Sequence, residues 1–162
     1  MVDITEISAM VAATGVLVGV VYYILDLRHQ TKIRKTDLVI SLMSDYNGRE
    51  KQQAFVDVTM AKFKDYGDFV EKYGMPFSSR NEVPMSFMIL GNFFEQLGVL
   101  FRKKLIDASL ISDLFPFTLW EKMKPILEGT RKEYHEPKYY EWFEYLYNEM
   151  TKREQKLQQS KA

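Results

Sequence analysis

The sequence predicts an all-α protein, with a single N-terminal transmembrane helix that continues into a cytoplasmic bundle of about five or six helices. Three observations indicate this class. One uncharged apolar stretch lies near the start of the chain, apolar residues recur at spacings of three and four through most of the rest, and no segment alternates as a strand does. We expect a transmembrane anchor at residues 1–26, a helical domain at 27–157 and a polar tail at 158–162.

The composition excludes several classes of protein. The chain has 162 residues, of which 46% are hydrophobic and 14% aromatic, and this is too apolar for a disordered protein. Its 22 Lys and Arg balance 22 Asp and Glu, so a globally basic nucleic-acid-binding protein is excluded and no nucleic-acid partner is expected. The absence of Cys excludes disulfides, thiolate catalysis and cysteine metal sites, and two His are too few for a multi-histidine site.

The segment Ile7–Leu25 is the predicted membrane span. It has 19 residues without a charge, and as a helix it would be about 28 Å long, close to the hydrocarbon thickness of a bilayer. Tyr22 and Tyr23 lie near its end, where aromatic rings favour the headgroup level. A cleaved signal peptide would need a basic segment at the start, whereas Asp3 and Glu6 are acidic, and no small-x-small cleavage site follows. A long buried core helix remains as the other alternative.

A basic cluster follows the predicted span directly. Arg28, Lys32, Arg34 and Lys35 come after it, and no Lys or Arg precedes it. Because positive flanks stay on the cytoplasmic side, we expect the N-terminus outside the cell membrane and residues 27–162 in the cytoplasm. The same four side chains are candidates for contact with anionic lipid headgroups, so the lipid bilayer is the first expected partner.

Small residues share one face of the predicted span. Ser8, Ala12, Gly15 and Gly19 recur at spacings of four, three and four. Small side chains let two helix backbones approach each other closely within a membrane. These residues therefore form a candidate helix dimer face, which would make the protein a homo-oligomer.

Helical spacing and turn residues divide the rest of the chain. The helix that follows the span should run to Asn47 and Gly48. A second helical region should cover Glu50–Tyr73, with a break near Gly67. Gly74–Pro84 concentrates Gly, Pro, Ser and Asn, so we expect a loop there.

The segment Met85–Leu105 is predicted to be the central helix of the bundle, because it is apolar on nearly all sides. Its main apolar stripe consists of Phe87, Leu90, Phe94, Leu97 and Phe101. The segment is long enough to cross a bilayer, but Asn92, Glu95 and Gln96 near its middle would be costly in lipid. We therefore predict a core helix and not a second span.

Three further helices are expected. Asp107 is a candidate N-cap for a short helix that ends near Phe115. Thr118 is a candidate N-cap for the next helix, which Pro125 should kink or split. Pro137 fits the first turn of the last helix. The inward face of that helix is predicted to hold Tyr139, Phe143, Leu146 and Met150.

A polar network is predicted inside the bundle. Glu95 lies among apolar residues with Asn92 and Arg102 near its face of the helix, and a buried carboxylate needs a paired charge or hydrogen bonds. The candidate network consists of Asn92, Glu95, Arg102, Trp120, Arg131 and Glu144. The functional interpretation of Glu95 is a general base or ligand-binding group. The structural interpretation is an ion pair or hydrogen bond between helices, which we favour because structural networks also bury carboxylates.

We predict no catalytic, cofactor-binding or metal-ligating residue and no cofactor. Di-iron helical bundles need Glu-x-x-His motifs, and neither His of this chain has a Glu three residues before it. No glycine-rich phosphate loop and no G-x-S-x-G elbow occurs. An enzyme is therefore the less favoured class.

Three stretches of the chain resemble a known family. They are Asn92–Asp107 (NFFEQLGVLFRKKLID), the segment that contains Trp120 and Arg131, and Tyr139–Met150 (YYEWFEYLYNEM). This pattern resembles an uncharacterised group of prokaryotic proteins, a domain of unknown function that often follows one N-terminal membrane helix. The resemblance covers nearly the whole chain. It implies the architecture given above and brings no activity, cofactor or partner.

The sequence therefore predicts a membrane-anchored helical interaction or scaffold module that binds another protein or itself. The alternative is a membrane-tethered enzyme or small-ligand receptor with a polar pocket around Glu95 and Arg131. A concave pocket that holds both side chains would favour this alternative.

Overall fold

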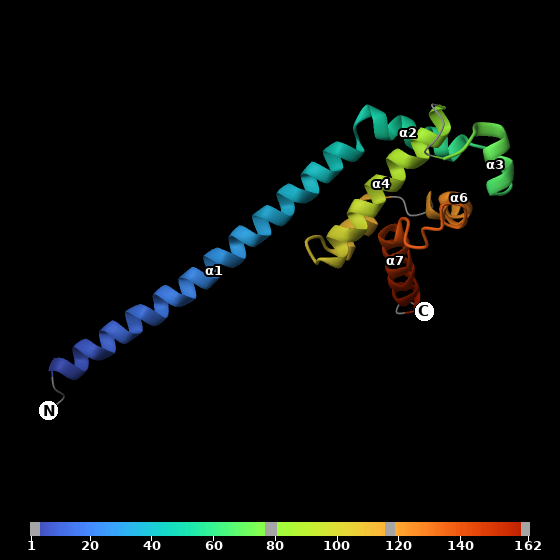
Figure 1. The fold of residues 1–162 in the computed structure, drawn as a ribbon. Helices are drawn as coiled ribbons and strands as arrows, with labels where there is room; N and C mark the ends of the chain where they lie inside the picture. Colours follow the sequence, from blue (N-terminus) through green and yellow to red (C-terminus); the bar gives the residue numbers. More distant parts are fainter. Residues whose placement is uncertain (1–3, 77–80, 116–118, 160–162) are drawn as a thin grey trace. The chain divides into compact units, whose positions relative to one another are not determined.

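The computed structural model describes residues 4–76, 81–115 and 119–159, with side chains from residue 13 onward. Within these ranges every regular element is a helix (Figure 1), which confirms the all-α class. The helices are α1 (Ile4–Tyr46), α2 (Arg49–Met60), α3 (Tyr66–Tyr73), α4 (Glu82–Arg102), α5 (Ala108–Leu114), α6 (Leu119–Tyr134) and α7 (Glu141–Gln159).

The chain divides into two compact units, residues 1–38 and residues 39–162. The helix α1 has 43 residues. Its residues up to Leu38 belong to the first unit, and its residues from Val39 onward begin the second unit. As the sequence predicted, α1 ends where Asn47 and Gly48 form a turn. The Asn47 N–H donates to the Met43 carbonyl at 2.9 Å, and the Gly48 N–H donates to the Asp45 carbonyl at 3.2 Å.

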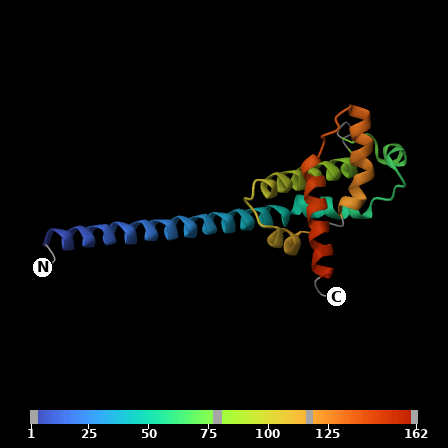
Figure 2. The same ribbon diagram turned by 90° about the horizontal axis from the view of Figure 1, so that it is seen from below.

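Helix α4 forms the centre of the second unit. It makes its most extensive contacts with α2 and α7, and Figure 2 shows α7 crossing it. Leu90, Phe94 and Leu97 from the predicted apolar stripe are buried, and Phe101 is half-buried. The sequence therefore placed the core helix correctly.

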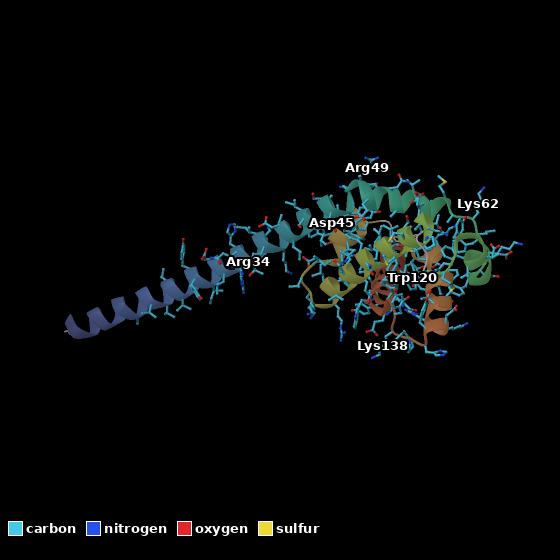
Figure 3. All side chains as sticks on the ribbon, turned by 45° about the horizontal axis from the view of Figure 1, so that its top comes forward. Arg34, Asp45, Arg49, Lys62, Trp120 and Lys138 are labelled. Atoms are coloured by element: carbon cyan, nitrogen blue, oxygen red, sulfur yellow. The ribbon has the colours of Figure 1, made fainter. Side chains whose placement is uncertain are left out.

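Aromatic rings fill much of the core. The rings of Phe94 on α4 and Phe143 on α7 stack with their centroids 4.9 Å apart. The Trp120 ring meets Phe143 edge-on, also at 4.9 Å, and Figure 3 marks Trp120 inside the second unit. Tyr46, in the last turn of α1, packs against Phe93 at 5.3 Å. These offset and edge-to-face contacts suit aromatic quadrupoles and connect α1, α4, α6 and α7.

The crossing of α4 and α7 requires glycine at one position. A Cβ atom at Gly98 would lie 2.1 Å from the carbonyl oxygen of Trp142 and 2.5 Å from its carbonyl carbon. Neither backbone atom can move alone. Gly98 therefore sets how closely the two helices approach.

Two predicted boundaries shift in the structure. The break in the second helical region falls at residues 61–65 and not at Gly67, because Asp65 is the N-cap of α3. Its side chain accepts a hydrogen bond from the Asp68 N–H at 2.9 Å. The predicted loop Gly74–Pro84 ends early, since α4 begins at Glu82 and takes Pro84 into its first turn, where proline is tolerated.

The remaining proline predictions were partly wrong. Pro125 does not split α6, which runs unbroken from Leu119 to Tyr134, whereas the predicted kink stays a prediction. Pro137 lies in the turn before α7 and not in its first helical turn. Asp107 stands at the N-cap position of α5, as predicted, but its side chain makes no capping hydrogen bond to the helix. The predicted cap Thr118 lies outside the described residues.

One helix among the described residues, α4, is long and apolar enough to cross a bilayer. Half of its apolar stretch is buried within the second unit, and core helices of soluble proteins share these features. The predicted span Ile7–Leu25 begins among residues 1–12, whose side chains lie outside the described part of the chain. This length and hydropathy criterion therefore does not cover the whole of the N-terminal span, which stays a prediction.

Candidate functional site

The polar residues singled out by the sequence gather in part around the N-terminal end of α7. Glu95 projects from α4, and its carboxylate accepts a hydrogen bond from the backbone N–H of Phe143 at 2.8 Å. The backbone N–H of Trp142 donates a second hydrogen bond to it. The first N–H groups of a helix have no partner within that helix, and the helix dipole favours an anion there. Glu95 therefore caps α7 from another helix.

Burial shifts the acidity of this carboxyl group. Desolvation is the largest effect and raises the pKa of Glu95 above its ordinary value, while the two backbone hydrogen bonds act in the opposite direction. Glu141 raises the pKa further, and Arg131 lowers it. A raised pKa also suits a general base, but here the carboxylate is occupied by the N-terminus of α7.

Arg131 ties the end of α6 to the start of α7. One terminal nitrogen of its guanidinium lies 2.7 Å from a carboxylate oxygen of Glu144. Its Nε donates to the carbonyl oxygen of Tyr139 at 2.8 Å, and the other terminal nitrogen donates to that of Tyr140 at 3.4 Å. The planar fork of Arg suits three acceptors at once. Arg131 thus holds the turn that precedes α7.

Asn92 enters the same cluster through a tyrosine. The hydroxyl group of Tyr140 donates to the Asn92 side-chain oxygen at 2.8 Å. Tyr140 is buried and has a φ of 54°, in the left-handed region that a bulky residue seldom adopts. Burial raises the pKa of its phenol. Asn92, in contrast, is exposed and not buried as predicted.

Two predicted members do not join this cluster. Arg102 is exposed near the end of α4, with its guanidinium carbon 4.1 Å from the centre of the Trp142 ring, so its predicted place in a buried network was wrong. Trp120 is buried, and its ring packs against Phe143 and Tyr147. The cluster therefore consists of Asn92, Glu95, Arg131 and Glu144 with the backbone of residues 139–143.

Sequence reasoning missed Tyr139 and Tyr140 as members of the cluster. Tyr139 was predicted to pack inward, but its role as an acceptor for Arg131 was not foreseen. The one available signal was the pair of adjacent aromatic residues directly before a helix. That signal does not reveal a left-handed backbone at Tyr140.

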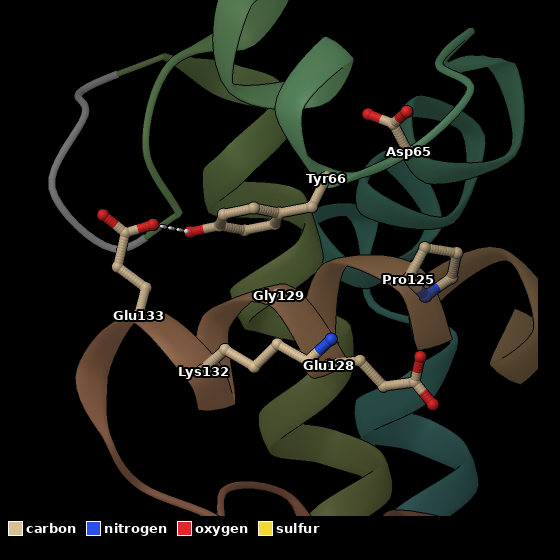
Figure 4. A pocket seen from close by; sticks show the side chains of 7 residues that line it. All are labelled: Asp65, Tyr66, Pro125, Glu128, Gly129, Lys132 and Glu133. Carbon is tan, nitrogen blue, oxygen red and sulfur yellow. Dashed lines mark hydrogen bonds between the residues drawn. The ribbon is translucent and has the colours of Figure 1, made fainter.

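An open cleft lies elsewhere in the second unit, between the start of α3 and α6. It has a volume of about 530 Å³, and Figure 4 shows its lining. The Tyr66 ring lies against Gly129, where an added Cβ would come 2.1 Å from a ring carbon. The Tyr66 hydroxyl donates to Glu133 at 3.0 Å. The pKa of Tyr66 is raised to about 12, mainly by burial and next by this hydrogen bond to Glu133.

A second cleft of about 350 Å³ is lined by Thr130, Tyr134, Glu136 and Tyr139. Neither cleft is lined by Glu95 or Arg131. Over the ranges that the structure describes, no group of three or more His, Asp or Glu side chains could hold a metal ion.

The residues predicted to act at the membrane lie on α1. Arg28, Lys32 and Arg34 are exposed, and Lys35 is half-buried; Figure 3 marks Arg34. Of the predicted helix dimer face, Gly15 and Gly19 have open space where a Cβ would stand. The side chains of Ser8 and Ala12 lie outside the described residues.

The fold is all-helical, and the polar cluster uses hydrogen bonds to Glu95 on α4 and from Arg131 on α6 to hold the start of α7. The family model that matches residues 9–150 is described as a domain of unknown function, DUF4760. The chain belongs to that family, which confirms the resemblance to an uncharacterised group. No curated protein and no solved structure matches the chain.

Proposed function

We propose that this protein is a single-pass membrane protein whose second unit is a helical interaction module at the cytoplasmic face of the cell membrane. The observation that carries the proposal is the apolar surface of α1. Every residue from Ala13 to Leu27 is exposed, and Val16, Leu17 and Val18 expose 66%, 66% and 64% of their surface. Each Å² of apolar surface left in water costs about 25 cal/mol. Lipid tails would cover this surface on all sides.

The charges next to this surface support both the location and the orientation. The stretch Ile7–Leu25 carries no charge, and the exposed Arg28, Lys32 and Arg34 follow it. At a cytoplasmic surface these cations would meet anionic headgroups, and each contributes about 1 kcal/mol there. The helical backbone satisfies its own N–H and C=O groups, as lipid demands. The resemblance to prokaryotic proteins with one N-terminal membrane helix supports the same layout.

The geometry of the polar cluster favours an interaction module over an enzyme. Glu95 and Arg131, which would carry a polar pocket, are bonded to the backbone at the start of α7. A partner protein or a second copy of the chain would then bind the outer surface of the bundle. A pull-down from mild detergent should return a reproducible partner or a self-contact, and the absence of both would count against this part of the proposal.

The membrane anchor is tested by charge insertion. The double variant Val18→Arg, Val21→Arg should move the chain from the alkali-resistant membrane fraction to the soluble fraction, because each charge at mid-span costs about 2.5–3.5 kcal/mol. The matched control is Ile40→Arg with Val56→Arg, two exposed apolar residues of the second unit. The control should stay with the membrane. A wild-type chain that alkali extracts completely would overturn the anchor.

Orientation is tested by labelling with a membrane-impermeant maleimide, since the chain has no cysteine of its own. The variant Val2→Cys should react in intact cells. The variant Lys62→Cys, at an exposed position of the second unit, should react only after permeabilisation. The reverse pattern would place the second unit outside.

The alternative, a membrane-tethered receptor for a small ligand, has one observation in its favour. The cleft of about 350 Å³ borders the polar cluster through Tyr139. A small molecule that raises the Tm of the wild-type chain, but not that of a Tyr139→Ala variant, would favour a receptor.

A further inference from the structure

The turn between α4 and α5 has an unusual backbone for its sequence. The Lys104 N–H donates to the Phe101 carbonyl at 2.9 Å, and the Leu105 N–H donates to the Leu100 carbonyl at 3.0 Å. This pair of hydrogen bonds is a Schellman motif, in which Lys104 takes the position that glycine normally fills. Its φ of 57° is left-handed and strained for a lysine. A charged residue stands where glycine would stabilise the fold.

The surface of this turn combines cations with exposed leucines. Arg102, Lys103 and Lys104 are consecutive and exposed. Leu105 and Leu110 expose 43% and 39% of their surface. Residues 102–110 carry three cations and one carboxylate, that of Asp107. Cations beside apolar side chains are the pattern by which a surface segment binds the interface of an anionic membrane.

We propose that the α4–α5 turn, residues 102–110, is a second membrane contact that docks the helical unit onto anionic lipid. The lysines bind headgroup phosphates or carboxylates, and the two leucines enter the interfacial layer. The inference rests on the proposed anchor for bringing the unit to a bilayer. It deepens that proposal, because it makes the second unit a peripheral membrane domain with a lipid-facing side.

Two further observations favour lipid as the occupant. The Arg102 guanidinium lies over the half-buried Trp142 ring, so an aromatic side chain of the kind found at membrane interfaces adjoins the turn. Leu110 also lines a small crevice with Val39, the first residue of the second unit. The turn therefore lies next to Val39, where the chain enters the second unit. In the sequence, residues 26–38 separate Val39 from the predicted span.

The test uses the full chain, reconstituted in vesicles, with an environment-sensitive fluorophore on a single introduced cysteine. The label stands at Ser109→Cys for the turn, at Val18→Cys for the anchor and at Glu128→Cys, exposed on α6, as the control. Vesicles are phosphatidylcholine alone or with phosphatidylserine, and a lipid-bound nitroxide is the quencher. We expect quenching at Ser109 in the phosphatidylserine vesicles, weaker quenching without that lipid, and none at Glu128.

Variants separate charge from folding. Lys104→Gly removes a cation and relieves the left-handed strain, so the Tm should stay equal or rise. The ratio of docked to undocked units should nevertheless fall roughly fivefold, and a further Lys103→Gln should lower it by about the same factor. Lys138→Gln, an exposed lysine of the α6–α7 turn, is the matched control and should leave docking unchanged.

The outcomes distinguish the two proposals. A quenched label at Val18 with an unquenched label at Ser109 would overturn the docking turn and leave the anchor standing. An unquenched label at Val18 would overturn the anchor, whatever the turn does. Equal quenching at Ser109 with and without phosphatidylserine, or full docking of the Lys104→Gly variant, would refute recognition of anionic lipid. A label at Ser109 that is shielded without being quenched would assign the surface to a protein and overturn the proposal.

Discussion

Removal of the Glu95 carboxylate should weaken the packing of α7 against α4. Glu95→Ala leaves the N–H groups of Phe143 and Trp142 without their acceptor in a partly buried setting. Hydrogen bonds to a charged group contribute about 1.5–3 kcal/mol, and the raised pKa shows that part of this gain is offset by desolvation. We therefore expect a loss of about 2 kcal/mol in the free energy of unfolding. Denaturant unfolding in mild detergent, followed by tryptophan fluorescence, measures it.

Glu95→Gln is the informative control, because it keeps an acceptor oxygen and removes the charge. Since burial raises the pKa of Glu95, the folded state holds its proton more tightly than the unfolded state does. The stabilisation from this group is complete below the unfolded pKa, about 4.3, and is lost as the pH rises through the raised folded pKa. Between pH 4 and 7 the wild type should lose stability relative to Glu95→Gln. A wild type that instead gains stability relative to Glu95→Gln as the pH rises from 4 to 7 would refute this argument, because the carboxylate would then be stabilised and not penalised in the folded state.

Three other substitutions test the crossing, the turn and the span. Gly98→Ala should cost about 3 kcal/mol of unfolding free energy, because its Cβ meets the Trp142 backbone. A loss below about 1 kcal/mol would show that the two helices can move apart at little cost. Arg131→Lys keeps the charge and loses the fork, so it should lower stability by about 1 kcal/mol in the same unfolding measurement. Gly15→Ile with Gly19→Ile should abolish cross-linking between copies of the chain without releasing it from the membrane, and unaltered cross-linking would remove the helix dimer face.

Local chemistry accounts for the parts of the fold that the sequence predicted well. The stop of α1 follows from Asn47 and Gly48, and α5 begins directly after Asp107, as predicted. Both depend on residues adjacent in the chain. The break before α3 ends at Asp65 and not at Gly67, because the Asp65 side chain caps the helix and a single glycine is tolerated in its first turn. Pro137 was misplaced because proline suits a turn as well as a first helical turn.

The candidate site was only half predictable, because its bonds join elements far apart in the chain. Glu95 was chosen correctly as a polar residue in need of partners, but those partners are backbone N–H groups, which every residue has and no sequence marks. Arg102 was assigned to the network because it lies two turns from Glu95 on nearly the same face. It falls at the end of α4, where solvent and the Trp142 ring are both within its reach.

One face of α4 carries the residues that hold the start of α7. Gly91, Glu95 and Gly98 are spaced by four and three residues and so lie on one face of the helix. A Cβ at Gly91 would lie 3.0 Å from the Tyr140 ring, Glu95 caps the chain two to three residues further on, and Gly98 meets the Trp142 backbone. Gly91 and Gly98 thus leave room for the start of α7 to pack closely against α4. The carboxylate of Glu95 between them accepts hydrogen bonds from the first N–H groups of α7. The same residues lie in or next to the stretch that carries the family resemblance, so the docking of α7 on α4 gives that pattern a structural reason without a catalytic one.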